Sequence, residues 1–191
     1  RAGSLAAPLD FSEEREVGPS LGAENVARGT KAVVFSFVFA LAFFLVYYRM
    51  FGLITCVALL LNLVMVVAVM SLFEATMTLP GFAGLVLSIG LSVDANVLIN
   101  ERIREELRAG VPPKTAIVTG YEKASGTILD ANLTAIIAGI ALYAFGTGPL
   151  KGFALTLMIG IMASMFTAIT VSRALVTLIY SRRKKLQSLA I

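Results

Sequence analysis

One acidic side chain stands inside an apolar stretch of the sequence, and its chemistry would be proton transfer. Asp94 lies in the run Ser92-Val93-Asp94-Ala95-Asn96, about five residues before that stretch ends. An ionised carboxylate in hydrocarbon costs roughly 2.5–3.5 kcal/mol, and the loss of hydration favours its protonated form. A carboxyl group that packed helices keep away from bulk water could therefore take up and release protons near neutral pH. The alternative is that Asp94 reaches water at the end of its helix.

The same triplet recurs as Asp130-Ala131-Asn132 in the next apolar stretch. Two facing carboxylates titrate as a pair, so Asp130 is a second candidate for the proton relay. It could equally be a solvated charge that suits the start of a helix. Polar residues that could support the carboxylates or hydrogen-bond between helices are Ser92, Asn96, Asn132, Thr134 and Asn62.

Small residues recur at a spacing of four, which allows the backbones of two helices to approach closely. Gly84, Ser88 and Ser92 form one such row, and Gly160 and Ser164 form another. We expect Gly84, Ser88, Gly160 and Ser164 to mark helix packing.

Several kinds of chemistry are excluded by the residues that are missing. The chain has no His and a single Cys, Cys56, so it lacks the ligands of a structural zinc site and any Ser/His or Cys/His pair. No phosphate-binding P-loop pattern occurs, so we predict neither an ATPase nor any other enzyme, and no metal or cofactor. The basic clusters flank apolar stretches, which indicates contact with anionic lipid and not with nucleic acid.

The elements that must position these residues are membrane helices. Of the 191 residues, 58% are hydrophobic and only 15% are charged, and the mean hydropathy is +0.86, which argues against a soluble protein. Each of five apolar stretches is near the roughly 20 residues that cross a bilayer. The sequence therefore predicts an all-α membrane protein with a bundle of five transmembrane helices within residues 31–181, at about 32–48, 51–73, 79–99, 127–145 and 152–179.

Basic residues predict the orientation of this bundle. Counting the loop 100–126, the tail 182–191 and Arg49, ten Lys and Arg fall on one side, whereas Lys151 alone lies in the turns of the other. The positive-inside rule then places the C-terminus in the cytoplasm and the N-terminus outside. Within the loop we expect a helix over Glu101–Arg108, a stop at Gly110, and an amphipathic interfacial helix over 115–123.

Residues 1–30 are polar, and no signal peptide precedes the first apolar stretch. We expect them to be the end of an external domain of a longer protein, with Pro8–Val17 as a strand and Gly18–Arg28 leading into the membrane. An expression remnant is the alternative.

Several runs of sequence resemble the bacterial SecD/SecF family of the Sec protein-export apparatus, in its SecD branch. They are YYRMFGL (47–53), LPGFAG (79–84), VDANVLINERIREEL (93–107), DANLT (130–134) and GTGPLKGF (146–153). The resemblance covers essentially the whole chain and concerns the C-terminal membrane half of the family.

The resemblance implies a half-bundle like that of resistance–nodulation–division (RND) transporters, in the bacterial inner membrane. It implies coupling of the proton-motive force to protein export, with Asp94 as the family's intramembrane aspartate. The implied partners are SecF, the SecYEG channel, the SecA ATPase, YajC and unfolded preprotein, which a periplasmic domain would handle. The alternatives are half of a proton-driven RND efflux transporter and a passive scaffold.

Overall fold

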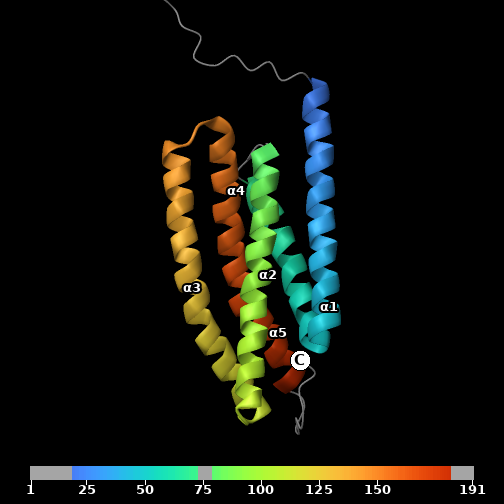
Figure 1. Ribbon diagram of the computed structural model, residues 1–191, viewed down its shortest axis with the longest axis vertical. Coiled ribbons are helices and arrows are strands. Elements are labelled where there is room, and N and C mark those ends of the chain that lie inside the picture. Colours follow the sequence, from blue (N-terminus) through green and yellow to red (C-terminus); the bar gives the residue numbers. More distant parts are fainter. Residues whose placement is uncertain (1–18, 73–78, 182–191) are drawn as a thin grey trace, which may run out of the picture.

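The computed structural model describes residues 19–72 and 79–181, and these residues form a bundle of helices (Figure 1). No strand occurs in these two ranges, which confirms the all-α prediction. The predicted strand Pro8–Val17 and the basic tail 182–191 lie outside the described residues. The elements are α1 (Pro19–Leu72), α2 (Leu79–Arg108), α3 (Pro113–Phe145), α4 (Gly148–Met165), the π-helix η1 (Phe166–Val171) and α5 (Ser172–Ser181).

The described residues contain four helices that are long and apolar enough to span a membrane and not the five predicted, but the first of them joins two helices across a kink. The stretches 32–48 and 51–73 both belong to α1, which folds back on itself so that its two arms lie side by side (Figure 1). Arg49 is the residue of α1 with non-helical dihedral angles, φ 47° and ψ −111°. The Cys56 thiol lies 3.6 Å from the carbonyl oxygen of Leu41, which only a reversed chain allows.

Gly52 explains why so short a reversal is possible. A Cβ atom at this position would overlap the backbone carbonyl of Phe44, so only glycine lets the second arm start this close to the first. The reversal therefore needs no polar loop.

The positive φ of Arg49 gives a prediction for stability. A non-glycine residue with positive φ is strained by about 1–2 kcal/mol, whereas glycine adopts such angles readily. We expect Arg49→Gly to stabilise the purified protein by about 1 kcal/mol, measured as a higher midpoint of thermal unfolding in detergent. Arg49→Ala loses the same charge and keeps the strain, so it should bring no gain. A Gly variant that melts no higher than the Ala variant would contradict the prediction.

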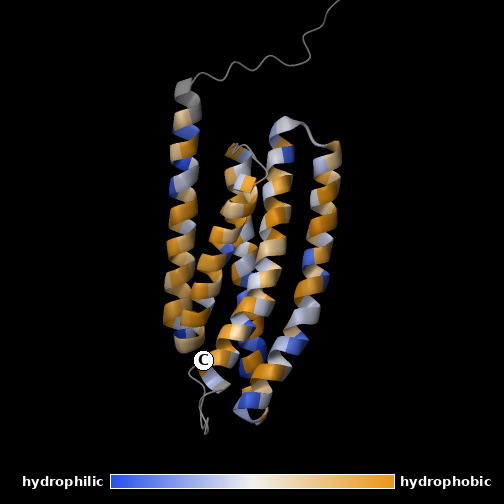
Figure 2. Ribbon diagram, turned by 180° about the vertical axis from the view of Figure 1, so that it is seen from behind, coloured by the Kyte–Doolittle hydropathy of each residue, from blue (hydrophilic) through white to orange (hydrophobic). Residues whose placement is uncertain are grey.

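α2 lies at the centre of the bundle and contacts α1, α3 and α4. It runs in the same direction as α4 and opposite to α3 (Figure 1). The outward faces are apolar, with large side chains that are almost fully exposed, such as Val46 (82%) and Phe145 (90%). Figure 2 shows hydrophobic residues along the length of the helices, as a bilayer environment requires.

The connection between α2 and α3 confirms the predicted stop at Gly110, which has φ +81°. The interfacial helix predicted over 115–123 is not a separate element, because α3 runs without interruption from Pro113 to Phe145. Its residues Ile117, Tyr121 and Ala124 are buried against neighbouring helices. The prediction differs from the structure because no proline after Pro113 ends the helix before the next apolar stretch.

Candidate functional site

Asp94 lies near the middle of α2, on the face that points away from the bundle. It is exposed and makes no hydrogen bond or ion pair within the described part of the chain. The buried face of α2 carries Ser88, Ser92, Asn96 and Asn100, one every four residues. Because two residues along a helix turn by about 200°, Asp94 points away from Ser92 and Asn96. The helices of this chain alone therefore do not enclose the carboxyl group.

Asp130 is also exposed, on α3, and its carboxyl group has no hydrogen bond or ion pair in the described segments. The register of the antiparallel pair follows from Gly120, where an added Cβ atom would lie 3.0 Å from the Cα of Ile103. From this crossing, Asp94 is nine residues back along α2 and Asp130 is ten residues forward along α3. At 1.5 Å per residue these steps are about 13.5 Å and 15 Å, so the two carboxylates lie at nearly the same height of the bundle.

Small residues line the contact between α2 and α4. Gly84 lies against the carbonyl of Phe153, and a Cβ atom on Gly160 would overlap the hydroxyl of Ser88. Since the two helices run in parallel, the next position of the row sets Ser92 opposite Ser164. The structure thus brings together the four residues expected at helix packing, Gly84, Ser88, Gly160 and Ser164.

The hydroxyls of Ser92 and Ser164 are fully buried and have no hydrogen-bond partner among the described residues. A buried hydroxyl without a partner costs about 1–3 kcal/mol. These serines contribute to the packing because they are small, which lets α2 and α4 approach closely. We call the row Gly84, Ser88, Ser92, Gly160 and Ser164 the small-residue seam.

Of the five polar residues expected to support the carboxylates or to hydrogen-bond between helices, only Asn62 makes an interhelical hydrogen bond, and the Ser92 hydroxyl makes none. Asn62 on α1 donates to the hydroxyl of Thr167 on η1 at 3.4 Å. The other three residues bond to backbone carbonyls four residues earlier in their own helices: Asn96 to Ser92 and Asn132 to Ile128, both at 2.8 Å, and Thr134 to Asp130 at 3.3 Å.

Two interhelical bonds join polar residues that the sequence pattern did not single out. Asn100 on α2 donates to Thr55 on α1 at 3.3 Å, and Tyr121 on α3 pairs with Ser172 on α5 at 2.8 Å. Asn100 continues the four-residue spacing of the buried face but falls just beyond the predicted end of its span. The spacing was the signal that could have identified it.

A polar and aromatic cluster fastens the reversal of α1 to α2. Tyr48 donates to the carboxylate of Glu101 at 2.9 Å, and Arg104 pairs with the same carboxylate at 2.6 Å. The guanidinium group of Arg104 also lies 5.0 Å from the ring centre of Tyr47, a cation–π geometry. These contacts hold the reversal in place.

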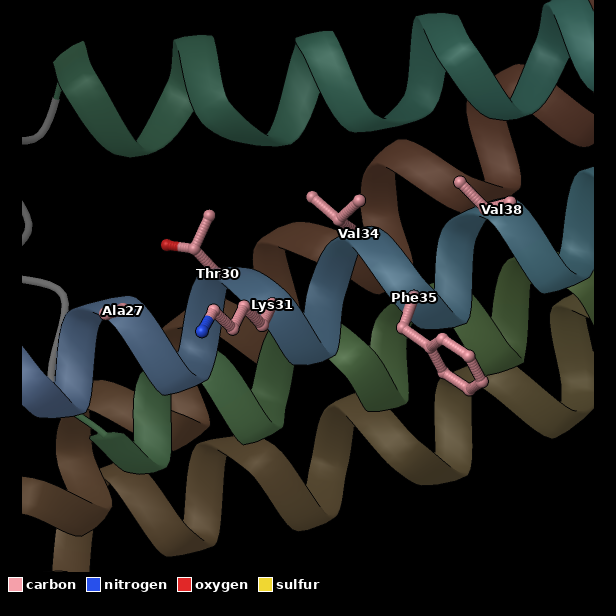
Figure 3. A pocket seen from close by; sticks show the side chains of 6 residues that line it. All are labelled: Ala27, Thr30, Lys31, Val34, Phe35 and Val38. Atoms are coloured by element: carbon pink, nitrogen blue, oxygen red, sulfur yellow. The ribbon is translucent and has the colours of Figure 1, made fainter.

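The described residues offer no metal centre, and the grooves found on them are open to the surface. Within residues 19–72 and 79–181 no group of three or more acidic or sulfur ligands is close enough to hold a metal ion. A surface groove of about 620 Å³ follows the first arm of α1 alone (Figure 3). Its side chains, Ala27, Thr30, Lys31, Val34, Phe35 and Val38, form a mostly apolar strip that suits lipid contact.

Comparisons with known proteins agree with the resemblance of the sequence. The family described as protein export membrane protein SecD/SecF, C-terminal, matches residues 4–182. The protein translocase subunit SecD of Pseudomonas aeruginosa is 56% identical over 183 residues, which are 96% of this chain and 30% of that protein. The SecD subunit of Desulfurispirillum indicum is 54% identical over 179 residues, which are 94% of this chain and 35% of that protein.

A solved structure shares the fold. The crystal structure of SecDF from Thermus thermophilus, a translocon-associated membrane protein, matches with a TM-score of 0.83 and 39% identity. The match covers 87% of this chain and 23% of that one. The chain thus spans about a third of the length of the SecD relatives.

Proposed function

Because the chain belongs to the SecD/SecF family of protein export membrane proteins, in its C-terminal part, we propose that it couples the proton-motive force to protein export as the membrane half of a SecD-like subunit. The observation that carries this proposal is Asp94, an unpaired carboxyl group near the middle of a membrane helix. Such a group is costly in lipid and is usually functional. Asp130, at the same height on α3, is proposed as a second member of the relay.

We propose that SecF covers the outer face of α2 that carries Asp94. This face consists of Ala83, Leu87, Gly90 and Asp94, which are all exposed. A Cβ atom at Gly90 would meet nothing of this chain within 4 Å, so the position leaves room for another helix. A facing subunit would supply the polar environment that the carboxylate lacks here.

The other proposed partners follow from the family. They are the SecYEG channel, the SecA ATPase and YajC, together with unfolded preprotein bound through a region outside this chain. The chain itself is proposed to contribute membrane coupling and no enzymatic reaction.

For the orientation, we propose that the end of the bundle formed by Arg49 and the α2–α3 turn faces the cytoplasm. The helix ends gathered there carry Arg102, Arg104, Arg108, Lys114 and Lys123, whereas the opposite end carries Lys151 after the α3–α4 turn and Arg28 and Lys31 near the start of α1. The positive-inside rule supports this choice. In this orientation the N-terminal end of α1 points to the periplasm and the C-terminus to the cytoplasm of the inner membrane.

The coupling step would be a change of charge at Asp94. The ionised carboxylate demands water or a cation, whereas the protonated group tolerates an apolar neighbour, so protonation shifts the preferred packing of the two subunits. α2 is tied to α1 by the hydrogen bond between Asn100 and Thr55. A movement of α2 would thereby reach α1 and the periplasmic region before it.

The proposed function is tested by replacing the matching third of Pseudomonas aeruginosa SecD with this chain. In cells depleted of SecD, the chimaera should restore preprotein export and crosslink to preprotein or to the channel. Dye efflux without export would favour the RND efflux alternative. Export that is restored but insensitive to collapse of the proton gradient would favour a passive scaffold.

The proposed contact with SecF gives a prediction at Gly90. A leucine there projects into the space of the partner helix, and its Cβ atom meets nothing of this chain within 4 Å, so Gly90→Leu should fold normally and lose most of its binding to SecF. Co-purification of tagged SecF with the chimaera measures this, with an expected loss of about tenfold or more. The control Gly148→Leu introduces the same side chain at another open position, the first residue of α4, and should bind normally. Undiminished capture by Gly90→Leu would place SecF elsewhere.

A further inference from the structure

Two adjoining surface grooves lie where α3 begins and α5 runs beside it. The smaller one, of about 240 Å³, is lined by Lys114, Ile117, Val118, Val176, Thr177 and Tyr180. The larger one, of about 580 Å³, follows η1 and α5 and is lined by Ile169, Thr170, Arg173, Ala174, Thr177 and Leu178. Thr177 lines both grooves, so they adjoin at this residue, and we call the pair the α3–α5 trough.

The charged groups of the α3–α5 trough are both cationic. Lys114 and Arg173 are exposed, and neither forms an ion pair within the described ranges. No carboxylate lines either groove. Two hydroxyls, those of Thr170 and Thr177, add hydrogen-bond donors to the same surface, so its polar groups suit a phosphate.

The rest of the trough is apolar. Val118 in the smaller groove and Leu178 in the larger one are large exposed hydrophobic side chains, and the ring of Tyr180 is buried against Phe51, with ring centres 5.4 Å apart. A free phosphate or a nucleotide would leave these walls unused. A ligand with a phosphate at one end and a hydrocarbon chain at the other would use both parts.

We propose that the α3–α5 trough binds an anionic phospholipid, with its phosphate between Lys114 and Arg173 and an acyl chain along Val118 and Leu178. Basic pockets between helices near the cytoplasmic surface are typical sites for anionic headgroups. The segment that follows α5 in the sequence, Arg182, Arg183, Lys184 and Lys185, has the same sign of charge as the trough and is disfavoured as its occupant. The proposal uses the membrane location of the chain and is independent of proton coupling.

Native mass spectrometry of the purified protein released from detergent tests the proposal. The probes are cardiolipin and phosphatidylglycerol, with phosphatidylethanolamine as the zwitterionic comparison. We expect anionic lipid to stay bound at concentrations where phosphatidylethanolamine does not. The double variant Lys114→Gln/Arg173→Gln should bind anionic lipid about 30-fold more weakly.

Matched variants separate this site from general attraction to basic protein. Lys114→Arg/Arg173→Lys keeps both charges and should bind normally, as should Lys151→Gln at the opposite end of the bundle. Val118→Trp keeps both charges but fills the trough, and it should also weaken binding. Three results would overturn the proposal. Millimolar inorganic phosphate alone displaces the lipid, or the zwitterionic lipid binds equally well. The third is unchanged binding by both the double variant and Val118→Trp.

Discussion

Asp94→Asn is expected to abolish proton-dependent export while the subunit still folds and assembles. Asparagine has nearly the same shape as aspartate but cannot ionise, so the switch between a charged and a neutral state is lost. The side chain is exposed and has no partner in the described part of this chain, so the substitution removes no contact on which the fold depends. Loss of a positioned proton-transfer group lowers the rate of the step that depends on it on the order of 100-fold or more.

The measurement is the rate of preprotein translocation into inverted membrane vesicles that contain the chimaeric subunit, with and without a proton gradient. Stimulation by the gradient should disappear in Asp94→Asn, and co-purification of SecF should persist. Glu105→Gln is the matched control, because Glu105 is an exposed carboxylate on the same helix but beyond the predicted membrane span. Full stimulation in Asp94→Asn would eliminate Asp94 as the coupling group.

The face that Asp94 occupies was the part of the site that the sequence could not predict. In a soluble helix, a polar residue marks the outer face because the inner face is apolar. In α2 the pattern is mixed, since the buried face carries Ser88, Ser92 and Asn96 while the outer face carries Leu87 beside Asp94. Hydrophobicity therefore did not separate the two faces, and only the packing of α4 against α2 does so.

The predicted number of helices differs from the structure for another reason. Composition identifies apolar stretches, and the charge of Arg49 interrupts one of them in the sequence. In the structure the neighbours of Arg49 on both sides stay helical, because Gly52 admits the backbone of Phe44 and makes a loop unnecessary. Features that depend on local chemistry were predicted better, such as the stop at Gly110 and the start of α3 at Pro113.

Gly160→Val is expected to destabilise the bundle more than any other substitution proposed for this chain. A Cβ atom at Gly160 would overlap the hydroxyl and Cβ of Ser88, and the neighbouring turns of α2 and α4 are held by Gly84 and Ser92 in the same small-residue seam. The helices would have to separate along the seam. Overpacking of this kind costs about 3 kcal/mol, which for a chain of this length lowers the midpoint of thermal unfolding by about 10 °C.

Thermal unfolding of the detergent-solubilised protein measures the effect, and Gly148→Val, at a position where a Cβ atom meets nothing, is the control. A melting temperature of Gly160→Val equal to that of the control would show that α2 and α4 do not meet as described. Ser88→Gly removes the obstructing side chain, so the double variant should recover part of the lost stability. Such recovery is the sign of direct contact between the two positions, because substitutions at distant sites would add their costs.

The same pair of variants links the seam to coupling. Ser88 lies on the buried side of α2 and Asp94 on its exposed side, so a wedge between α2 and α4 would push the Asp94 face toward the proposed SecF surface. If α2 transmits the effect of protonation as a rigid element, Gly160→Val should lose gradient-stimulated export together with stability, and Ser88→Gly should restore both in the same proportion. Restored stability without restored export would mean that the seam has a role in coupling beyond holding the two helices together.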